Sequence, residues 1–325
     1  MQGTTSLRWG MISTAAIGAE LVPAFHRAAG NELIAVASRD PERGKSYAQE
    51  YRIPRSYVGY ESLLADEELD AVYIALPNAL HGEWIRAAIE AGKHVLCEKP
   101  LTPTSVEAAE LFDLASSRRL VLAEAFMYRH HPKTLRVREM LREGLIGELQ
   151  TIRCSFSFRV VDPRSDIRYS AELAGGALRD VGCYCVSYST FAVDAEPESV
   201  FGYVPQAQAD VDERFYATLA FSAGVVAQFD CGLNSRLNLG ATLVGSDGVI
   251  HVPMPWYAHL DPLSVYLHKG HDVTEIPTPG ENAYLLEIED LAAAIRGERE
   301  QLITPAETVR NLRVIERLRE SAGLD

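Results

Sequence analysis

The sequence lacks long apolar runs and is short of positive charge. No stretch approaches the roughly 18 consecutive apolar residues that a membrane-spanning helix needs. There are 31 lysines and arginines against 45 aspartates and glutamates, which gives a net charge of −14. An acidic surface repels phosphate backbones and anionic lipid headgroups. We therefore expect neither nucleic acid nor a membrane as a partner.

Cysteine is also scarce. The five cysteines stand at scattered positions, namely Cys97, Cys154, Cys183, Cys185 and Cys231. An odd, scattered set predicts no disulfide framework and suits a reducing compartment. Cys183 and Cys185 could form half of a metal site, but no partners at zinc-ligand spacing accompany them. Residues 1–9 show no secretion-signal pattern of positive charge followed by an apolar segment. We predict a cytoplasmic protein without a bound metal.

The first third of the chain alternates short apolar runs with helical patterns. We expect strands at Leu7–Ser13, Glu32–Ala37, Ala71–Leu76, His94–Glu98 and Leu120–Ala123, and helices at Ala19–Ala29, Asp40–Tyr51, His81–Ala91 and Thr104–Arg118. Asp40-Pro41-Glu42 supplies an N-cap, a proline at the first helical position and an acid in the first turn. Strands separated by helices in this way predict an α/β fold with a parallel, doubly wound sheet.

The later region has longer alternating runs that predict a large, mostly antiparallel sheet. The runs are Leu149–Phe158, Glu198–Val204, Glu213–Ser222, Val225–Leu233, Leu239–Gly245, Gly248–His251 and Ser264–Lys269. Turns are expected at Ser222-Ala223-Gly224, Asn234-Ser235 and Ser246-Asp247-Gly248, and helices at Pro132–Glu143, Asp180–Ala192, Ala283–Arg296 and Pro305–Ser321. With 325 residues the chain suits two domains, which we place at 1–123 and 124–325, with the last helices free to pack back on the first.

A candidate cofactor turn follows the first strand, between Gly10 and Gly18. A strand-turn-helix at this point of a doubly wound sheet is where a dinucleotide pyrophosphate binds. Small residues, Ser13 and Ala15, occupy the first two glycine positions of the usual fingerprint, and Gly18 occupies the third. The alternative is a plain tight turn. On the cofactor interpretation, the contacts come from Ser13, Thr14, Ala15 and Ile17.

The second strand ends at Ser38-Arg39, about 20 residues beyond that turn. This is where an acid would bind the ribose hydroxyls of NAD, or an arginine would bind the extra phosphate of NADP. The nearest acid, Asp40, is already explained as an N-cap. Arg39 could be an ordinary solvated arginine, but its position favours NADP(H), with NAD(H) also possible.

Two further strand ends carry polar groups at the same edge of the sheet. The third strand leads into Leu76-Pro77-Asn78 and His81, and the fourth leads into Glu98-Lys99-Pro100. Ligands of open parallel sheets bind outside the carboxyl ends of the strands. Glu98 and Lys99 could be a surface ion pair. Their position instead favours a site that includes Leu76, Asn78, His81, Glu98 and Lys99.

The stretch from Gly175-Gly176 to Tyr184 predicts a tight turn into a helix. Asp180 and Tyr184 are four residues apart, so an α-helix would put them on one face. Lys99 beside Tyr184 would supply a proton donor and acceptor for a hydroxyl–carbonyl pair. The alternative is an acid placed at a helix N-terminus and a core tyrosine.

Together these motifs resemble the glucose–fructose oxidoreductase / inositol dehydrogenase / rhizopine-catabolism (Gfo/Idh/MocA) superfamily over essentially the whole chain. The motifs are the degenerate glycine turn, Leu76-Pro77-Asn78 with His81, Glu98-Lys99-Pro100, Glu124-Ala125-Phe126-Met127-Tyr128-Arg129, and Gly175-Gly176-Ala177-Leu178 followed by Asp180 and Gly182. Asp166-Ile167-Arg168-Tyr169 and Tyr184 resemble the branch of dimeric dihydrodiol dehydrogenases, glucose–fructose oxidoreductase, xylose dehydrogenases and sugar 3-ketoreductases. The inositol dehydrogenase branch usually has histidine where this chain has Tyr184.

The resemblance implies an N-terminal Rossmann domain and a C-terminal α/β domain that forms a homodimer or dimer of dimers. It implies hydride transfer between NADP(H) and a carbinol or carbonyl carbon of a small sugar, ketosugar, polyol or dihydrodiol. Lys99 would bind the reacting oxygen, Tyr184 would supply or relay the proton, and Asp180 would orient substrate hydroxyls. Glu98 would position Lys99 and the nicotinamide, and the pocket wall would include Arg129, Arg168 and Tyr169.

Two other functions remain open. One is a catalytically silent regulator that keeps the fold and senses nucleotide, which intact Lys99 and Tyr184 argue against. The other is a redox-neutral, NAD-dependent glycosidase, which Ser38-Arg39 argues against.

Overall fold

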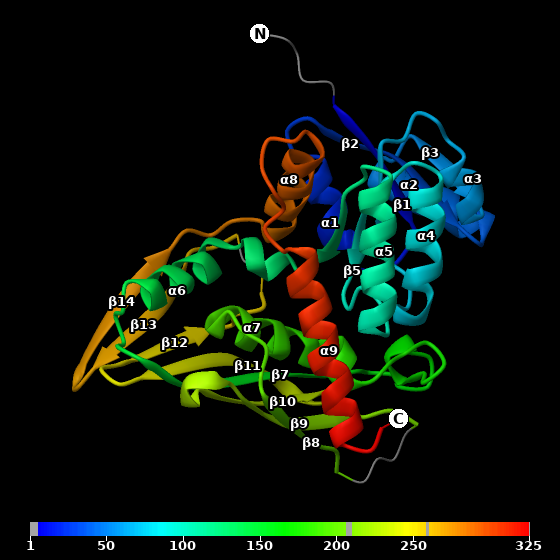
Figure 1. The fold of residues 1–325 in the computed structure, drawn as a ribbon. Helices are drawn as coiled ribbons and strands as arrows, with labels where there is room; N and C mark the ends of the chain where they lie inside the picture. The colour runs from blue at the N-terminus through cyan, green and yellow to red at the C-terminus, as the bar shows by residue number, and fades with distance from the viewer. Residues whose placement is uncertain (1–5, 206–209, 258–259, 325) are drawn as a thin grey trace. The chain divides into compact units, whose positions relative to one another are not determined.

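The computed structural model describes residues 6–205, 210–257 and 260–324. The chain divides into two compact units (Figure 1). The first unit comprises the chain up to Met127 together with Asn282–Thr308, and the second comprises Tyr128–Glu281 with the chain from Val309 onward. A segment distant in sequence thus returns to the first unit.

The first unit is built on a six-stranded parallel sheet with the order β3-β2-β1-β4-β5-β6. Its strands are β1 (Leu7–Ile12), β2 (Asn31–Ser38), β3 (Arg55–Val58), β4 (Ala71–Ile74), β5 (His94–Glu98) and β6 (Leu122–Ala125). This is the strand order of a dinucleotide-binding Rossmann sheet. The predicted doubly wound fold is therefore confirmed.

The helices of the first unit are α1 (Gly18–Phe25), α2 (Pro41–Tyr51), α3 (Tyr60–Leu64), α4 (His81–Glu90), α5 (Ser105–Ser117) and α8 (Ala283–Ile295). Helix α1 is shorter than predicted, because the chain after Phe25 closes into turns that lead to Gly30 at a φ of 68°. Helix α8 packs against α1. Its Ile288 and Leu291 join the core that contains Trp9 and Phe25.

The N-terminus of α2 forms as the sequence predicts. The Asp40 carboxylate accepts the N–H groups of Glu42 and Arg43 at 2.9 and 3.1 Å. Strand β3 and helix α3 were not predicted. Strand β3 is four residues long and alternates between half-buried and exposed positions, so it carries no apolar run.

The second unit is built on an eight-stranded sheet with the order β14-β13-β12-β11-β7-β10-β9-β8. Its strands are β7 (Leu149–Arg159), β8 (Ser199–Tyr203), β9 (Arg214–Ala220), β10 (Val226–Gly232), β11 (Asn234–Gly245), β12 (Val249–Pro253), β13 (Leu263–Lys269) and β14 (Asp272–Thr278). The pairing of β7 with β10 is parallel and the other pairings are antiparallel. The mostly antiparallel sheet is therefore as predicted, but Asn234 lies in β11 and pairs with Arg159, so the turn predicted there is wrong.

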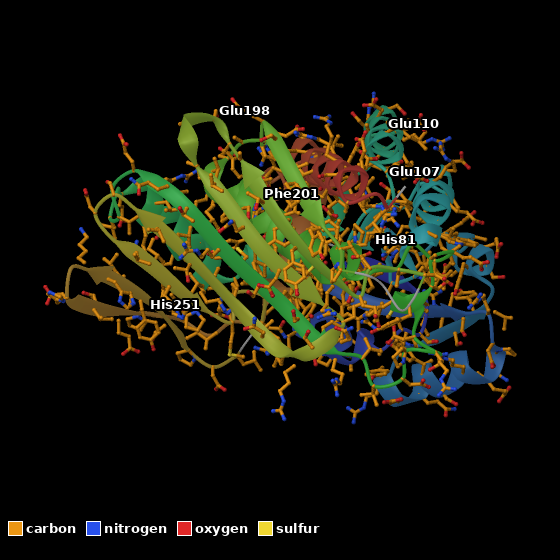
Figure 2. The ribbon with its side chains drawn as sticks, turned by 90° about the horizontal axis from the view of Figure 1, so that it is seen from below. His81, Glu107, Glu110, Glu198, Phe201 and His251 are labelled. Carbon is orange, nitrogen blue, oxygen red and sulfur yellow. The ribbon has the colours of Figure 1, made fainter. Side chains whose placement is uncertain are left out.

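Helices α6 (Pro132–Arg142) and α7 (Cys183–Val193) lie on one side of this sheet, and α9 spans Pro305–Ser321 (Figure 1). The other side, which we call the outer face, carries exposed aromatic side chains. Phe201, Tyr203 and Tyr216 are 60%, 55% and 41% exposed. Figure 2 looks onto this face, where Phe201 of β8 and His251 of β12 are labelled.

The predicted helix at Asp180–Ala192 begins with a different local structure. Leu178–Gly182 forms a π-helical turn, and α7 follows from Cys183. Every residue from Cys183 to Phe191 is buried, so α7 has no solvated face. Asp180 therefore lies in the π turn ahead of α7, whereas Tyr184 lies in the first turn of α7.

Candidate active site

The turn between β1 and α1 has the backbone features of a dinucleotide site. Ser13 adopts a φ of 100°, in the region that favours glycine, and its N–H donates to the Ala37 carbonyl at 3.1 Å. No side chain caps α1. The N–H groups of Gly18 and Ala19 donate within the turn, to the carbonyls of Ala15 and Ala16 at 3.1 Å, so the helix N-terminus that a pyrophosphate would face follows directly from the turn.

Gly18 is the one fingerprint position that must be glycine. A Cβ here would overlap Tyr47 Oη and would lie 2.9 Å from Tyr47 Cζ. Tyr47 projects from α2 and its hydroxyl contacts Met11 Sδ at 3.7 Å. The third glycine therefore allows α1 to approach β1 and α2 closely.

The end of β2 presents a basic group close to that turn. Ser38 is buried and its Oγ accepts the Asp40 N–H at 3.2 Å, while Arg39 is exposed. Arg43, in the first turn of α2, donates from Nη2 to the Thr14 carbonyl at 3.0 Å. Sequence reasoning missed Arg43. The signal that could have identified it is its position three residues after the N-cap Asp40, in the first turn of α2.

His81 joins two of the predicted loops from inside the protein. It is fully buried, with Nδ1 2.9 Å from the Pro100 carbonyl and Nε2 2.8 Å from the Leu76 carbonyl. Burial lowers the pKa of His81, and the positive charge of Lys99 lowers it further, so the ring is neutral at neutral pH. His81 therefore holds the segment after β4 to the segment after β5. Asn78 opens a short 3-10 turn beside it.

Glu98 lies at the end of β5 among buried acidic groups. Tyr73 Oη donates to Glu98 Oε1, and the Lys99 main-chain N–H donates to Glu98 Oε2 at 3.3 Å. Glu287 of α8 is 2% exposed, and burial, then the charge of Glu98, raises its pKa well above the usual range. Both causes favour the neutral form of the Glu287 carboxyl group. Sequence reasoning missed Glu287, whose role depends on the return of α8 to this unit.

In the second unit, Arg168 and Asp180 are brought together. Arg168 Nε donates to Asp180 Oδ2 at 2.9 Å, and its Nη1 lies 3.2 Å from both oxygens of Asp166. Asp180, then Asp166, raises the pKa of Arg168. Tyr169 is half-buried and donates to the Leu233 carbonyl at 3.4 Å. The predicted pocket residues Arg168 and Tyr169 thus adjoin the predicted Asp180.

Tyr184 belongs to a cluster of aromatic rings. The centre of its ring lies 5.2 Å from that of Phe156, 5.7 Å from Tyr128 and 6.0 Å from Trp256. Trp256, which sequence reasoning missed, is buried and donates from Nε1 to the Ser155 carbonyl at 3.1 Å. These rings fix the plane of the Tyr184 phenol.

Arg129 is buried in the second unit, with its guanidinium 4.0 Å from the centre of the Phe191 ring. This cation–π contact gives it a packing role beside α7. All five cysteines are buried, and none of them forms a disulfide bond. Among the residues described, no group of three or more His, Cys, Asp or Glu side chains could hold a metal ion. No helix within the described ranges is long and apolar enough to cross a membrane.

Comparison with known proteins adds a family match over both units. A model described as "Oxidoreductase family, NAD-binding Rossmann fold" matches residues 7–126, and a model of the GFO/IDH/MocA C-terminal domain matches residues 134–251. D-xylose 1-dehydrogenase (NADP(+)) 2 of Haloferax volcanii is 36% identical over 97% of each chain. Trans-1,2-dihydrobenzene-1,2-diol dehydrogenase of Homo sapiens is 30% identical over 84% of this chain and 82% of its own.

Solved structures agree with these relatives. The 3-ketoreductase KijD10 from Actinomadura kijaniata, crystallised with NADP and TDP-benzene, superposes with a TM-score of 0.91. It is 32% identical and the match covers 98% of each chain. An aldose-aldose oxidoreductase from Caulobacter crescentus, at 23% identity and a TM-score of 0.90, shares the fold.

Proposed function

The chain belongs to the Gfo/Idh/MocA oxidoreductase family, and from this we propose that it is an NADP(H)-dependent oxidoreductase of sugar-like substrates. The reaction transfers a hydride between the nicotinamide and a carbinol or carbonyl carbon of a sugar, ketosugar or related polyol or dihydrodiol. Relatives named for xylose, a dTDP-linked ketosugar and a dihydrodiol support this substrate class. The observation that carries the proposal is the shared sheet edge of the first unit, with a basic group after β2 and Glu98-Lys99 after β5.

The basic group supports NADP(H) over NAD(H). The exposed guanidinium of Arg39 and the nearby guanidinium of Arg43 supply the positive charge that a ribose 2′-phosphate requires, and Ser38 adds a hydroxyl. A guanidinium matches a phosphate with paired, charge-assisted hydrogen bonds. Ser13, Thr14, Ala15 and Ile17 hold the pyrophosphate against the N-terminus of α1.

At the reacting end, the chain supplies acid–base groups. When bound, the nicotinamide supplies hydride transfer to or from the substrate carbon. Lys99 donates a hydrogen bond to the reacting oxygen and stabilises the charge that develops there. Glu98 orients Lys99 through its hydrogen bond from the Lys99 main-chain N–H.

The second unit contributes the proton donor and the residues that bind the substrate. Tyr184 supplies or relays the proton to the reacting oxygen. Asp180 accepts hydrogen bonds from substrate hydroxyls, held by its ion pair with Arg168. Tyr169 and Arg129 form part of the pocket wall, with Arg129 held by its contact with Phe191 of α7.

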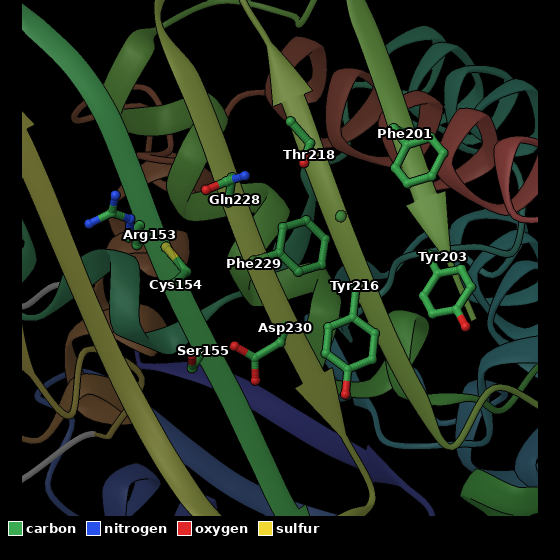
Figure 3. Close-up of a pocket in the computed structure, with 11 residues that line it drawn as sticks. Arg153, Cys154, Ser155, Phe201, Tyr203, Tyr216, Thr218, Gln228, Phe229 and Asp230 are labelled. Atoms are coloured by element: carbon green, nitrogen blue, oxygen red, sulfur yellow. Dashed lines mark hydrogen bonds between the residues drawn. The ribbon is translucent and has the colours of Figure 1, made fainter. Parts of the chain in front are cut away.

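The enzyme further acts, on this proposal, as a homodimer or dimer of dimers in the cytoplasm. The outer face of the eight-stranded sheet carries a hollow of about 420 Å³ lined by Tyr203, Tyr216, Arg153 and Asp230, among others (Figure 3). Exposed aromatic groups beside polar ones are typical of an interface between subunits. Five cysteines without a disulfide bond suit a reducing compartment.

An NADP(H)-linked spectrophotometric screen tests the activity. Aldoses, ketosugars, nucleotide-linked ketosugars and trans-dihydrodiols are compared, with NAD(H) run in parallel. We expect turnover with at least one class and a higher kcat/KM with NADP(H). A cofactor that stays bound and is regenerated within each turnover would instead identify the redox-neutral glycosidase, and the absence of any turnover would identify a silent regulator.

Arg39→Asp tests the cofactor preference. A hydrogen bond to a charged group contributes about 1.5–3 kcal/mol, so losing it should cut the NADP(H):NAD(H) ratio of kcat/KM by at least about tenfold. Arg52, the exposed C-cap residue of α2, provides the control. Arg52→Asp makes the same charge change and should leave the NADP(H):NAD(H) ratio of kcat/KM unaltered. A wild-type enzyme that is more efficient with NAD(H) would show that the assignment of Arg39 is wrong.

A further inference from the structure

Asp212 is a buried carboxylate that the proposed reaction does not use. It lies two residues before β9 and is 1% exposed. Its Oδ1 is buried and has no hydrogen-bond partner among the described residues. A carboxylate is costly to bury, because its charged form loses the hydration that it has in water. The hydrogen bonds that Asp212 accepts through its other oxygens indicate its role.

Asp212 holds the start of the turn that carries Asp180. Its Oδ2 accepts the Leu178 N–H at 2.7 Å, and its main-chain oxygen accepts the Ala177 N–H at 2.7 Å. The turn supplies no side-chain cap of its own. The Asp180 N–H then donates to the Gly176 carbonyl at 3.0 Å. Two of the first N–H groups of the turn thus depend on Asp212.

Arg168 holds the same turn from another direction. Its carbonyl accepts the Gly176 N–H at 2.8 Å, and its Nε donates to Asp180 Oδ2 at 2.9 Å. A Cβ at Gly175 would overlap the Arg168 carbonyl, and a Cβ at Gly176 would overlap Asp212 Oδ1. The two glycines therefore permit Arg168 and Asp212 to close on the turn, which fixes where Asp180 lies.

The groups around Asp212 set its charge. Burial opposes ionisation most strongly and raises the pKa of Asp212 to about 6, whereas the Leu178 N–H, then Arg319 of α9 and Arg179 of the turn, favour the ionised form. Cys231 of β10 also faces it, and burial, then the charge of Asp212, raises the pKa of that thiol. Asp212 is therefore ionised at neutral pH and takes up a proton under mildly acidic conditions.

We propose that Asp212 is a positioning residue for this reaction: its ionised carboxylate holds the turn that presents Asp180, and protonation of Asp212 loosens that turn and lowers turnover. The inference rests on the proposed function, because it acts through the grip of Asp180 on the substrate. A charged acceptor binds an N–H about twice as strongly as a neutral one. The protonated acid therefore holds Leu178 more weakly.

Asp212→Asn mimics the protonated acid at every pH and supplies the test. Wild type, Asp212→Asn and the control Asp210→Asn, whose site is exposed, are compared from pH 5 to 8.5 with NADPH and the substrate found in the screen. We expect the wild-type to Asp212→Asn ratio of kcat/KM to be about threefold to tenfold at pH 8 and to approach one at pH 5. The dissociation constant of NADPH should stay within about twofold, since Asp212 does not lie in the cofactor-binding unit.

A second variant tests the charge without altering the turn. Arg319→Gln removes a charge that favours ionised Asp212, so the acid limb of kcat/KM should move to higher pH while activity at pH 8 is kept. If Asp212→Asn does not fold, the shift of the acid limb in Arg319→Gln tests the role of Asp212 by itself.

A ratio that is constant across the pH range, or an acid limb that Arg319→Gln leaves unmoved, overturns the role of Asp212. The absence of NADP(H) turnover in the wild type and all variants would instead overturn the proposed function.

Discussion

Replacing Gly18 by alanine should destabilise the first unit, mainly because the new methyl group collides with the Tyr47 side chain. The new Cβ would overlap Tyr47 Oη, and would lie 2.9 Å from Tyr47 Cζ and 3.2 Å from Met11 Cε. The φ of Gly18 is not positive, so alanine fits the backbone and by itself should stabilise it by about 0.4–1 kcal/mol. Forcing extra atoms into a packed site costs about 1–3 kcal/mol. We expect a net loss of about 1–2 kcal/mol in the free energy of unfolding.

The contact can be removed from the other side. Tyr47→Phe deletes the overlapping oxygen and gives up only a weak contact with Met11 Sδ. In that background Gly18→Ala should cost less, because the overlapping oxygen is gone while ring carbon Cζ and Met11 Cε remain close, which gives a coupling energy of about 1 kcal/mol in a double-mutant cycle. Tyr51→Phe is the matched control, because its ring contacts that of Tyr47 at 4.5 Å but does not meet Gly18. Tyr51→Phe should not reduce the loss in unfolding free energy that Gly18→Ala causes.

The assay is urea-induced unfolding followed by circular dichroism, together with the dissociation constant of NADPH. Because Gly18 opens the helix that we propose binds the pyrophosphate, NADPH affinity should fall in Gly18→Ala and recover in part in the double variant with Tyr47→Phe. The reasoning is refuted if Gly18→Ala unfolds at the wild-type free energy, or if its loss is the same with and without the Tyr47 hydroxyl.

Three further predictions concern the chemistry, the buried charge and the assembly. Lys99→Ala should cut kcat by about 10²-fold or more with NADPH affinity little changed, and Tyr184→Phe should cost less; a folded Lys99→Ala enzyme with near wild-type kcat would contradict the mechanism. Burial raises the pKa of Asp212 from 3.8 to about 6, so its stabilising contribution is present below about pH 4 and is lost as the pH rises through 6. At 1.36 kcal/mol per pKa unit, raising the pH from 4 to 8 should shift the difference in unfolding free energy between Asp212→Asn and wild type by up to about 3 kcal/mol in favour of the variant. This shift adds to a pH-independent loss from the weaker hold of asparagine on the Leu178 N–H; urea unfolding that finds the same difference at pH 4 and pH 8 would count against it. Light scattering at micromolar concentration should return at least twice the chain mass of 35.8 kDa, and Tyr216→Glu on the outer face should lower it; a wild-type protein of monomer mass would exclude the proposed interface.

The sequence predicted the elements that carry their own pattern. The apolar run His94–Glu98 became β5 at those bounds, and the Asp40-Pro41 pair became the start of α2. Strand β14 (Asp272–Thr278) escaped prediction, because it is largely exposed and carries no apolar alternation. Patterns of burial are readable only where an element has a buried side.

The candidate site was predictable for a different reason. Lys99 and Arg39 stand at strand ends, and parallel strands of one sheet bring their carboxyl ends to one edge. Residues that contact the candidate site residues or their supporting turns only through long-range packing were missed. Glu287 belongs to a helix that returns from the end of the chain, and Asp212 depends on hydrogen bonds to a turn 34 residues earlier. Long-range contacts of this kind leave no local periodicity in the sequence.

The return of Asn282–Thr308 to the first unit sets the order in which the chain can mature on the ribosome. Trp9 and Phe25 share their core with Ile288 and Leu291 of α8. At about 5–20 residues per second, translating the chain from Met127 to Thr308 takes roughly 10–35 seconds. During that interval Trp9 and Phe25 lack their core partners Ile288 and Leu291, whereas all of the second sheet is synthesised before α8. A fragment that stops at Met127 would lack these partners permanently and would expose more of its apolar core to water than the full chain does.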